Sequence, residues 1–368
     1  MKKTALILSG GGFKCSYEVG ALNLIAENWT AITGKSGQMK FDLVAGVSAG
    51  VFNGGMVAMD KLSELNEFWN LLAKNGGKEI FESDIIDNRG NFSPDTEKLA
   101  RFLPDTWFCI KALFKSVFGM ITGKGFKKSL LNEVIKEIEN NVAEIRSLGT
   151  HEPLRQKIEH YFSKDSFPED TRFLCGFVSL EDARYHLVEA QNFDTDTDLA
   201  EAVLASLSLP VLSAPVPEVG FNHKKVKNLM DGGIQNISPV GSVLEYIRSD
   251  TESDYELFII NCNNTRMENY GNEKLNIATI SLKALNDFLM SEIFRNDMKT
   301  FLLINELAKQ AAPGELVIKG KKLRNFKFHY VHPEAEDRED SFNLSMEVIL
   351  DRKARGYADA TRVFKPFL

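Results

Sequence analysis

This 368-residue sequence has only four cysteines, no long apolar run and no excess of basic over acidic residues. No run of 18 uninterrupted apolar residues is present, so we expect no membrane span. The apolar stretch that follows Lys2 and Lys3 is too short for a signal peptide. The four cysteines form no Cys-x-x-Cys pair, which argues against a disulfide framework or a structural zinc site and favours reduced thiols in a cytoplasm. A net charge of −7 argues against a nucleic-acid partner.

The pattern of strands and helices predicts an α/β fold with a mostly parallel central sheet flanked by helices. Apolar runs at 5–8 and 41–45 read as buried strands, and each is followed by glycines and then a helical pattern. Alternating strands and helices are typical of a parallel sheet covered by helices. We expect one domain over 1–368, with a predominantly helical insertion at 60–165 that acts as a cap or lid. The part at 275–368 should be mainly helical and pack on the core.

A candidate nucleophile lies where the second predicted strand ends. Ser48 is flanked by Gly46 and Gly50, and a helix is predicted to start directly after it. Small neighbours allow a sharp turn that lifts the serine hydroxyl above the sheet and points a helix N-terminus at it. A chance match to this short pattern is the alternative, but the strand and the helix are predicted where the turn requires them.

Gly10, Gly11 and Gly12 close the first predicted strand. Their backbone N–H groups suit an oxyanion or a phosphate. A dinucleotide-binding fingerprint would need glycine at position 15, which is Cys15, so we favour an oxyanion hole over that function or over a plain tight turn. One right-handed crossover separates this loop from Ser48, which predicts neighbouring strands.

A candidate general base follows another strand-like run. Asp231 is followed by Gly232 and Gly233, so it can approach another loop closely, as a base must. Taken alone, a β-turn aspartate would be the more common explanation.

These motifs together resemble the patatin-like phospholipase family. The run from Ser9 to Lys14 resembles its glycine-rich oxyanion loop ending in a basic residue, 46–50 its nucleophile elbow, and 231–233 its Asp-Gly-Gly box. The resemblance is clear over 1–59 and 171–240, fainter at 342–364 and weak over 60–165. It departs from the family at Cys15, where glycine is usual. It implies a three-layer patatin-like fold and a Ser48–Asp231 dyad, without histidine or cofactor, that cleaves acyl esters of phospholipids or lysophospholipids.

Two other functions remain open from the residues alone. An α/β-hydrolase triad would use Ser48, Asp231 and either His329 or His332, although its oxyanion loop would follow a third strand rather than the first. A lipid- or protein-binding module without turnover is the third hypothesis. No metal site is expected: the His329–His332 pair has no third ligand nearby, and a strand with partly exposed imidazoles is favoured. The acidic run at 194–198 lacks the glycine of a calcium loop and suits the start of a helix.

The stretch 101–128 stands out by its charge. It holds six basic residues against one acidic residue, in a chain that is acidic overall. An apolar stripe from Trp107 to Ile121, flanked by Lys111 and Lys115, suits a helix lying in a lipid interface, or alternatively an ordinary core helix. We therefore expect a lipid or membrane-surface substrate and peripheral membrane contact through this stretch, whereas protein partners are unknown.

Overall fold

The computed structural model describes residues 2–83, 86–87, 93–94, 146–147, 149–210, 212–263, 291–311, 316–318, 320–334, 337 and 343–368. The insertion expected at 60–165 is described only near its ends, where two helices lie, α4 (Leu62–Asn75) and α8 (Glu152–Tyr161), together with a short ribbon of β3 (Ile86–Asp87) and β4 (Ser93–Pro94). The charged stretch 101–128 lies outside the described residues, so its helix stays a prediction.

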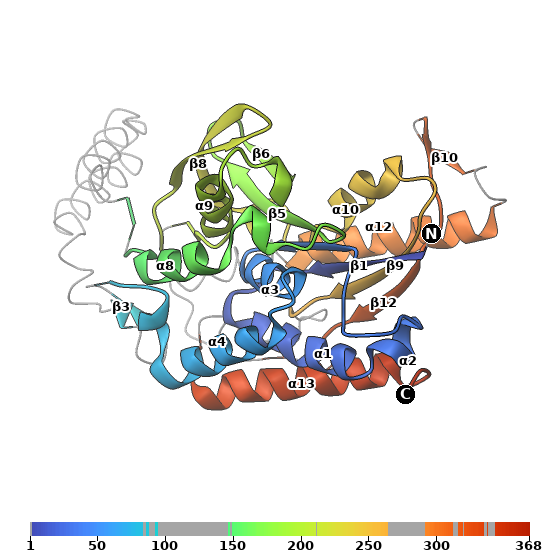
Figure 1. Ribbon diagram of the computed structural model, residues 1–368, viewed down its shortest axis with the longest axis horizontal. Coiled ribbons are helices and arrows are strands. Elements are labelled where there is room, and N and C mark those ends of the chain that lie inside the picture. The colour runs from blue at the N-terminus through green and yellow to red at the C-terminus, as the bar shows by residue number, and fades with distance from the viewer. Residues whose placement is uncertain are drawn as a thin grey trace, which may run out of the picture.

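Within the described residues, an eight-stranded sheet runs through the centre of the molecule (Figure 1). Its order is β12-β9-β1-β2-β5-β8-β7, with β6 paired to β5. The first five strands of this order are parallel to one another, whereas the pairings of β6, β7 and β8 are antiparallel. The bounds are β1 Lys2–Leu8, β2 Leu43–Val47, β5 Arg172–Ser179, β6 Arg184–Glu189, β7 Val216–Phe221, β8 Lys224–Asp231, β9 Asp254–Ile260 and β12 Lys327–Val331.

Helices cover both faces of the sheet, which confirms the three-layer α/β prediction. Side chains alternate along β1: Leu6 and Leu8 join the larger apolar core, whereas Ala5 and Ile7 join a second core on the opposite face. The larger core includes residues of α1 (Ser16–Glu27), α2 (Trp29–Thr33), α3 (Ala49–Ala58), α4, α8, α9 (Asp196–Ser206) and α13 (Met346–Phe364). The second includes residues of α10 (Val240–Tyr246) and α12 (Ser291–Gln310).

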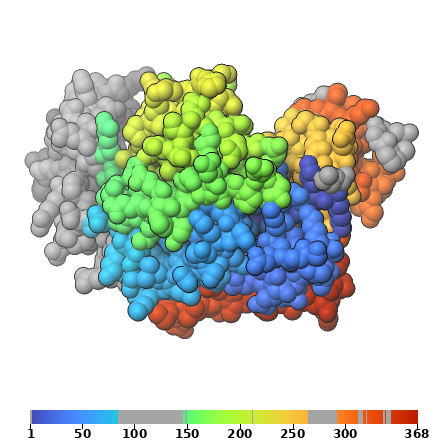
Figure 2. Space-filling model, viewed as in Figure 1, coloured from blue at the N-terminus to red at the C-terminus, as the bar shows by residue number. Residues whose placement is uncertain are grey.

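The two ends of the chain pack together through α1 and α13. Figure 2 shows the blue N-terminal and red C-terminal segments side by side along one edge of the molecule. A Cβ added to Gly20 would lie 1.8 Å from the carbonyl oxygen of Lys353, and one added to Gly356 would lie 1.9 Å from that of Tyr17. Glycine at both positions therefore lets the helix backbones touch. The C-terminal part also supplies β12 to the sheet, at the place where we predicted a strand with the His329–His332 pair in a mainly helical region.

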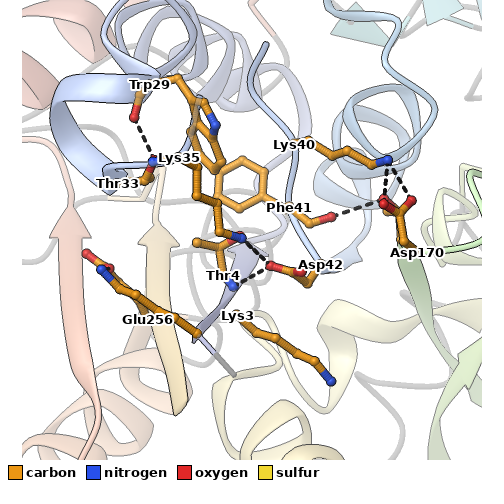
Figure 3. A network of polar contacts seen from close by, with 12 residues as sticks. Lys3, Thr4, Trp29, Thr33, Lys35, Lys40, Phe41, Asp42, Asp170 and Glu256 are labelled. Atoms are coloured by element: carbon orange, nitrogen blue, oxygen red, sulfur yellow. Dashed lines mark hydrogen bonds and ion pairs between the residues drawn. The ribbon is translucent and has the colours of Figure 1, made fainter. Parts of the chain in front are cut away.

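A polar network fixes the register of β1 against β2 at the amino ends of the strands (Figure 3). The Asp42 carboxylate accepts hydrogen bonds from the N–H and the hydroxyl of Thr4, at 2.7 and 2.9 Å, and pairs with Lys35 at 2.6 Å. This register places Leu8 opposite Gly46 at the other end of the strands. The glycine loop and the serine turn therefore leave the sheet side by side, as the crossover rule predicted.

Candidate active site

Ser48 lies on a strained turn between β2 and α3. Its backbone has φ 53° and ψ −138°, a conformation that a residue with a side chain rarely adopts. The flanking glycines make this turn possible by close approach: a Cβ on Gly46 would lie 2.3 Å from the carbonyl oxygen of Gly50. One on Gly50 would lie 2.3 Å from that of Ser9. The elbow therefore needs both glycines for steric reasons.

The end of α9 holds the serine turn and the aspartate strand in place. The backbone N–H of Ser48 donates to the Ser206 hydroxyl at 2.9 Å, and that hydroxyl donates to the carbonyl of Gly176 at 2.6 Å. Two residues later, the carbonyl of Ser208 accepts the backbone N–H of Asp231 at 3.0 Å. One short segment thus positions both members of the predicted dyad.

Strand register brings Asp231 to the level of Ser48. Val47 is opposite Gly176 and Asp231 is opposite Phe177, on the same edge of β5, because β6 pairs with the other edge at both residues. The carboxyl ends of β2 and β8 therefore meet on this edge, and a Cβ added to Gly232 would lie 2.6 Å from the Val47 side chain and 2.8 Å from the Gly176 carbonyl oxygen. Glycine at 232 therefore allows the Asp231 turn to approach the elbow.

The Asp231 carboxyl is buried, with an exposed fraction of 1%. Its Oδ1 accepts the backbone N–H of Gly233 at 2.7 Å, and its Oδ2 has no hydrogen-bond partner within the described part of the chain. Burial raises the pKa of Asp231 from 3.8 to about 7, against the opposing influence of the Ser48 hydroxyl and the Gly233 N–H. A carboxylate with such a pKa is suited to accept a proton at neutral pH.

The glycine loop departs from its predicted role at one position. The N–H of Gly10 donates to the carbonyl of Ile237 at 2.7 Å, so it is not free to bind an oxyanion. The carbonyl of Gly10 accepts the Asn263 amide at 2.7 Å. Because C=O and the next N–H of a trans peptide point in opposite directions, the Gly11 N–H points away from Asn263. No acceptor for the N–H groups of Gly11 and Gly12 is recorded among the described residues, which leaves these two as candidate donors.

Gly10 instead has a steric role, because an added Cβ would lie 2.8 Å from the Cβ of Ser48. Lys14 follows the glycine loop. Its side chain is buried, and its backbone N–H donates to the carbonyl of Gly11 at 3.2 Å.

A pocket of about 80 Å³ lies against the Ser48 turn. Ser48, Gly12 and His151 line it, and the rest of its wall is almost entirely apolar. The apolar part of the wall includes Phe52, Phe68, Trp69, Leu72, Leu154 and Leu207. Such a wall suits a hydrocarbon chain placed with its reactive end at the serine.

A family model described as "Patatin-like phospholipase" matches residues 6–244, which is more than half of the chain. The chain belongs to the patatin-like phospholipase family. No curated protein matches the sequence. Among solved structures, this patatin-like protein is similar to the crystal structure of VipD from Legionella pneumophila, with 13% identity, a TM-score of 0.40 and coverage of 100% of this chain and 67% of that chain.

The histidines of the alternative triad lie away from the nucleophile of this patatin-like protein. His329 is on β12, which β9 and β1 separate from β2, and its Nε2 is 2.6 Å from the Glu256 carboxylate. It is buried at 7% exposure, so the expectation of a partly exposed imidazole was wrong there; it packs against the rings of Phe258 and Phe364. His332 contacts the carbonyl of Pro333. The acidic run starts α9 as predicted, since the Thr195 hydroxyl accepts the N–H of Asp198 at 3.0 Å.

Several residues of this patatin-like site escaped the sequence interpretation. The Ser206 hydroxyl accepts the backbone N–H of Ser48, and the Ile237 carbonyl accepts that of Gly10. Both pairs are distant in sequence, and no spacing rule identifies them. His151 lines the pocket and is within hydrogen-bond distance of the Ser213 hydroxyl, and burial lowers its pKa to about 4. A neutral imidazole is therefore present at neutral pH. Its position within the predicted insertion gave no signal in the sequence.

Proposed function

We propose that this protein is a serine acyl hydrolase that cleaves fatty-acyl esters of phospholipids or lysophospholipids. Its membership of a family of lipid acyl hydrolases supports the reaction class. One observation carries the proposal further: the strained Ser48 turn lines an apolar pocket, beside a buried carboxyl whose pKa is about 7. An ester with an acyl chain in this pocket would have its carbonyl at the serine.

The reaction follows from the groups present. Asp231 accepts the proton of the Ser48 hydroxyl, whose oxygen attacks the ester carbonyl. The N–H groups of Gly11 and Gly12 stabilise the negative oxygen of the tetrahedral intermediate, helped by the N-terminus of α3. The alcohol leaves with the proton from Asp231, and water then releases the fatty acid from the acyl-enzyme by the same steps. Losing one oxyanion donor typically costs about 2.7–4 kcal/mol in the transition state.

Ser48→Ala and Asp231→Asn variants test the dyad. Each should reduce hydrolysis of a short soluble ester to background while the protein keeps its circular dichroism spectrum and its melting temperature within a few degrees. Ser208→Ala is a matched control, because the Ser208 hydroxyl is buried nearby but donates only to the carbonyl of Leu204 at 2.8 Å. Retained activity in either dyad variant would refute the mechanism.

A fluorophosphonate probe separates the enzyme from a binding module that has kept the fold. Labelling of the wild type that disappears in Ser48→Ala supports turnover chemistry, and absence of labelling in the folded wild type supports the binding module. Replacing His329 and His332 by Gln tests the triad, which requires a large loss of activity, whereas the dyad predicts little change.

We also propose that the insertion at 60–165 forms a cap over the site and that 101–128 brings the protein to a lipid surface. The described helices at its ends contribute Phe68, Trp69, Leu72 and Leu154 to the pocket wall, which supports a cap. Among the described residues, none of the helices has the length and apolarity needed to span a bilayer. A peripheral contact through basic residues, worth about 1 kcal/mol each near an anionic surface, would serve such a substrate.

A further inference from the structure

Two cysteines far apart in sequence meet beneath the glycine loop. Cys15 ends the short helical turn Gly12–Cys15 that follows the loop, and Cys262 is the second residue after the end of β9. Their Sγ atoms are 3.4 Å apart, and both residues are buried, at 0% and 2% exposure. The remaining described cysteine, Cys175, is buried with no thiol contact recorded among the described residues.

Both thiols contact the backbone of the loop itself. The Cys15 Sγ is 3.5 Å from the carbonyl oxygen of Ser9, and the Cys262 Sγ is 3.6 Å from that of Gly10. A Cβ added to Gly11 would lie only 2.4 Å from the Cys262 Sγ. Movement of the Cys262 sulfur therefore displaces the Gly10–Gly11 peptide group, which carries the Gly11 N–H donor, and movement of the Cys15 sulfur displaces the peptide group before it.

We propose that Cys15 and Cys262 form a reversible disulfide that switches off the oxyanion loop when a peroxide is present. The Cys262 thiolate attacks one peroxide oxygen, breaking the O–O bond to give a sulfenic acid and, with one proton, water. The Cys15 sulfur then attacks the sulfenic sulfur, and the hydroxyl leaves as a second water with the Cys15 proton. Two thiols are oxidised by two electrons in total, and one peroxide is reduced to two waters.

The surroundings of the two thiols suit this order of steps. Although burial opposes it, hydrogen bonds from Cys15 and Ser9 lower the pKa of Cys262. Burial raises the pKa of Cys15 well above its ordinary value. The thiolate therefore forms first on Cys262, which is the attacking sulfur.

A metal ion is the competing occupant of this cluster. The Glu18 carboxyl has an oxygen within 4.8 Å of both sulfurs, which is a spacing that could hold an ion. However, burial raises the pKa of Glu18 well above its ordinary value, and the carboxyl is hydrogen bonded to Asn53 and Ser9. A carboxyl that holds its proton more tightly and is already engaged in hydrogen bonds is a poorer ligand, which favours the thiol pair acting alone.

Closing the bond requires the two sulfurs to move together from 3.4 Å to about 2.05 Å. This movement breaks their contacts with the Ser9 and Gly10 carbonyls and shifts the N–H donors by a fraction of that distance. A misplacement of about 1 Å in a catalytic group can lower the rate about a hundredfold. We expect the oxidised protein to lose ten- to hundredfold in kcat, with a smaller change in KM because the pocket wall is untouched. This effect on activity rests on the proposed hydrolase function, whereas formation of the bond does not.

The test treats the full-length protein with hydrogen peroxide and then follows two independent readouts. Peptide mapping by mass spectrometry under non-reducing conditions should find the Cys15–Cys262 pair joined with loss of two hydrogen atoms. Hydrolysis of a soluble ester should fall ten- to hundredfold and recover with dithiothreitol. Cys15→Ala should resist this inactivation, and the matched control Cys175→Ala, which removes a buried but unpaired thiol, should behave like the wild type.

Other outcomes overturn the proposal. If peroxide leaves the two thiols unjoined, or if stoichiometric zinc is found bound to them in the purified protein, the disulfide is rejected whatever the activity. If the disulfide forms but activity is unchanged, or if Cys15→Ala loses activity to the same degree, the switch is rejected. Because peptide mapping needs no turnover, a protein without esterase activity still gives a decisive answer on the bond. If Cys15→Ala fails to fold, Cys15→Ser provides the same comparison.

Discussion

Ester hydrolysis should rise about tenfold per pH unit below about pH 7 and level off above it, because Asp231 must be ionised to accept the Ser48 proton. The same burial that raises its pKa should weaken the fold at high pH. A shift of the Asp231 pKa from 3.8 to about 7 lowers the free energy of unfolding by about 4 kcal/mol between low and high pH, since one pKa unit is worth about 1.4 kcal/mol. The folded state holds this proton more tightly than the unfolded state, so stability is full below pH 3.8, falls between pH 3.8 and 7, and is constant above.

Asp231→Asn removes the titration and provides the comparison. Relative to the wild type, this variant should gain about 2–3 kcal/mol of unfolding free energy between pH 5 and pH 8, measured by urea denaturation. Asp250→Asn is the control: Lys3 lowers the pKa of Asp250, so its carboxylate is ionised over this whole range and the effect of the substitution should not change with pH.

The kinetic assay is kcat/KM for a soluble p-nitrophenyl ester between pH 4 and pH 9, because this quantity reports the ionisations of the free enzyme. An acid limb near pH 4 would fit either His151, whose pKa burial lowers to about 4, or an Asp231 with its ordinary pKa of 3.8, and would refute a base whose pKa is raised to about 7. An unchanged stability difference between pH 5 and pH 8 would show that the Asp231 pKa is not raised in the folded protein.

Three further predictions concern packing and the lipid surface. Gly50→Ala should abolish most ester hydrolysis and lower the unfolding free energy by about 1–3 kcal/mol, because its Cβ would lie 2.3 Å from the Ser9 carbonyl oxygen; wild-type kinetics would contradict the steric argument. Gly356→Ala should lower the unfolding free energy by a similar amount, because its Cβ would lie 1.9 Å from the Tyr17 carbonyl oxygen. Gly241→Ala, whose Cβ meets open space in α10, should raise the unfolding free energy by up to about 1 kcal/mol in the same denaturation assay. Equal effects of these two substitutions would contradict the proposed helix contact. Binding to anionic vesicles should weaken, while soluble ester hydrolysis is spared, when Gln replaces Lys111, Lys115, Lys124, Lys127 and Lys128; unchanged binding at low salt would reject the interfacial role.

Local patterns were sufficient to predict the parallel part of the sheet and the elbow. The apolar runs that end at Gly10 and Gly46 became β1 and β2, adjacent and parallel, because a right-handed crossover leaves few other arrangements. The direction of β8 could not be read in this way. It pairs antiparallel with the part of β5 that extends beyond the end of β2, on the same edge, and this arrangement depends on contacts between segments distant in sequence.

The sequence by itself determined which residues are candidates for the chemistry, because glycines beside Ser48 and Asp231 are required by close backbone approach and leave a local pattern. Only the tertiary structure decided how those residues are supported and tuned. The Ile237 carbonyl that occupies the Gly10 N–H, the Ser206 hydroxyl that holds Ser48, and the contact between Cys15 and Cys262 all join segments distant in sequence. The pKa of Asp231 likewise depends on burial, which is a property of the whole packed core and of no single motif.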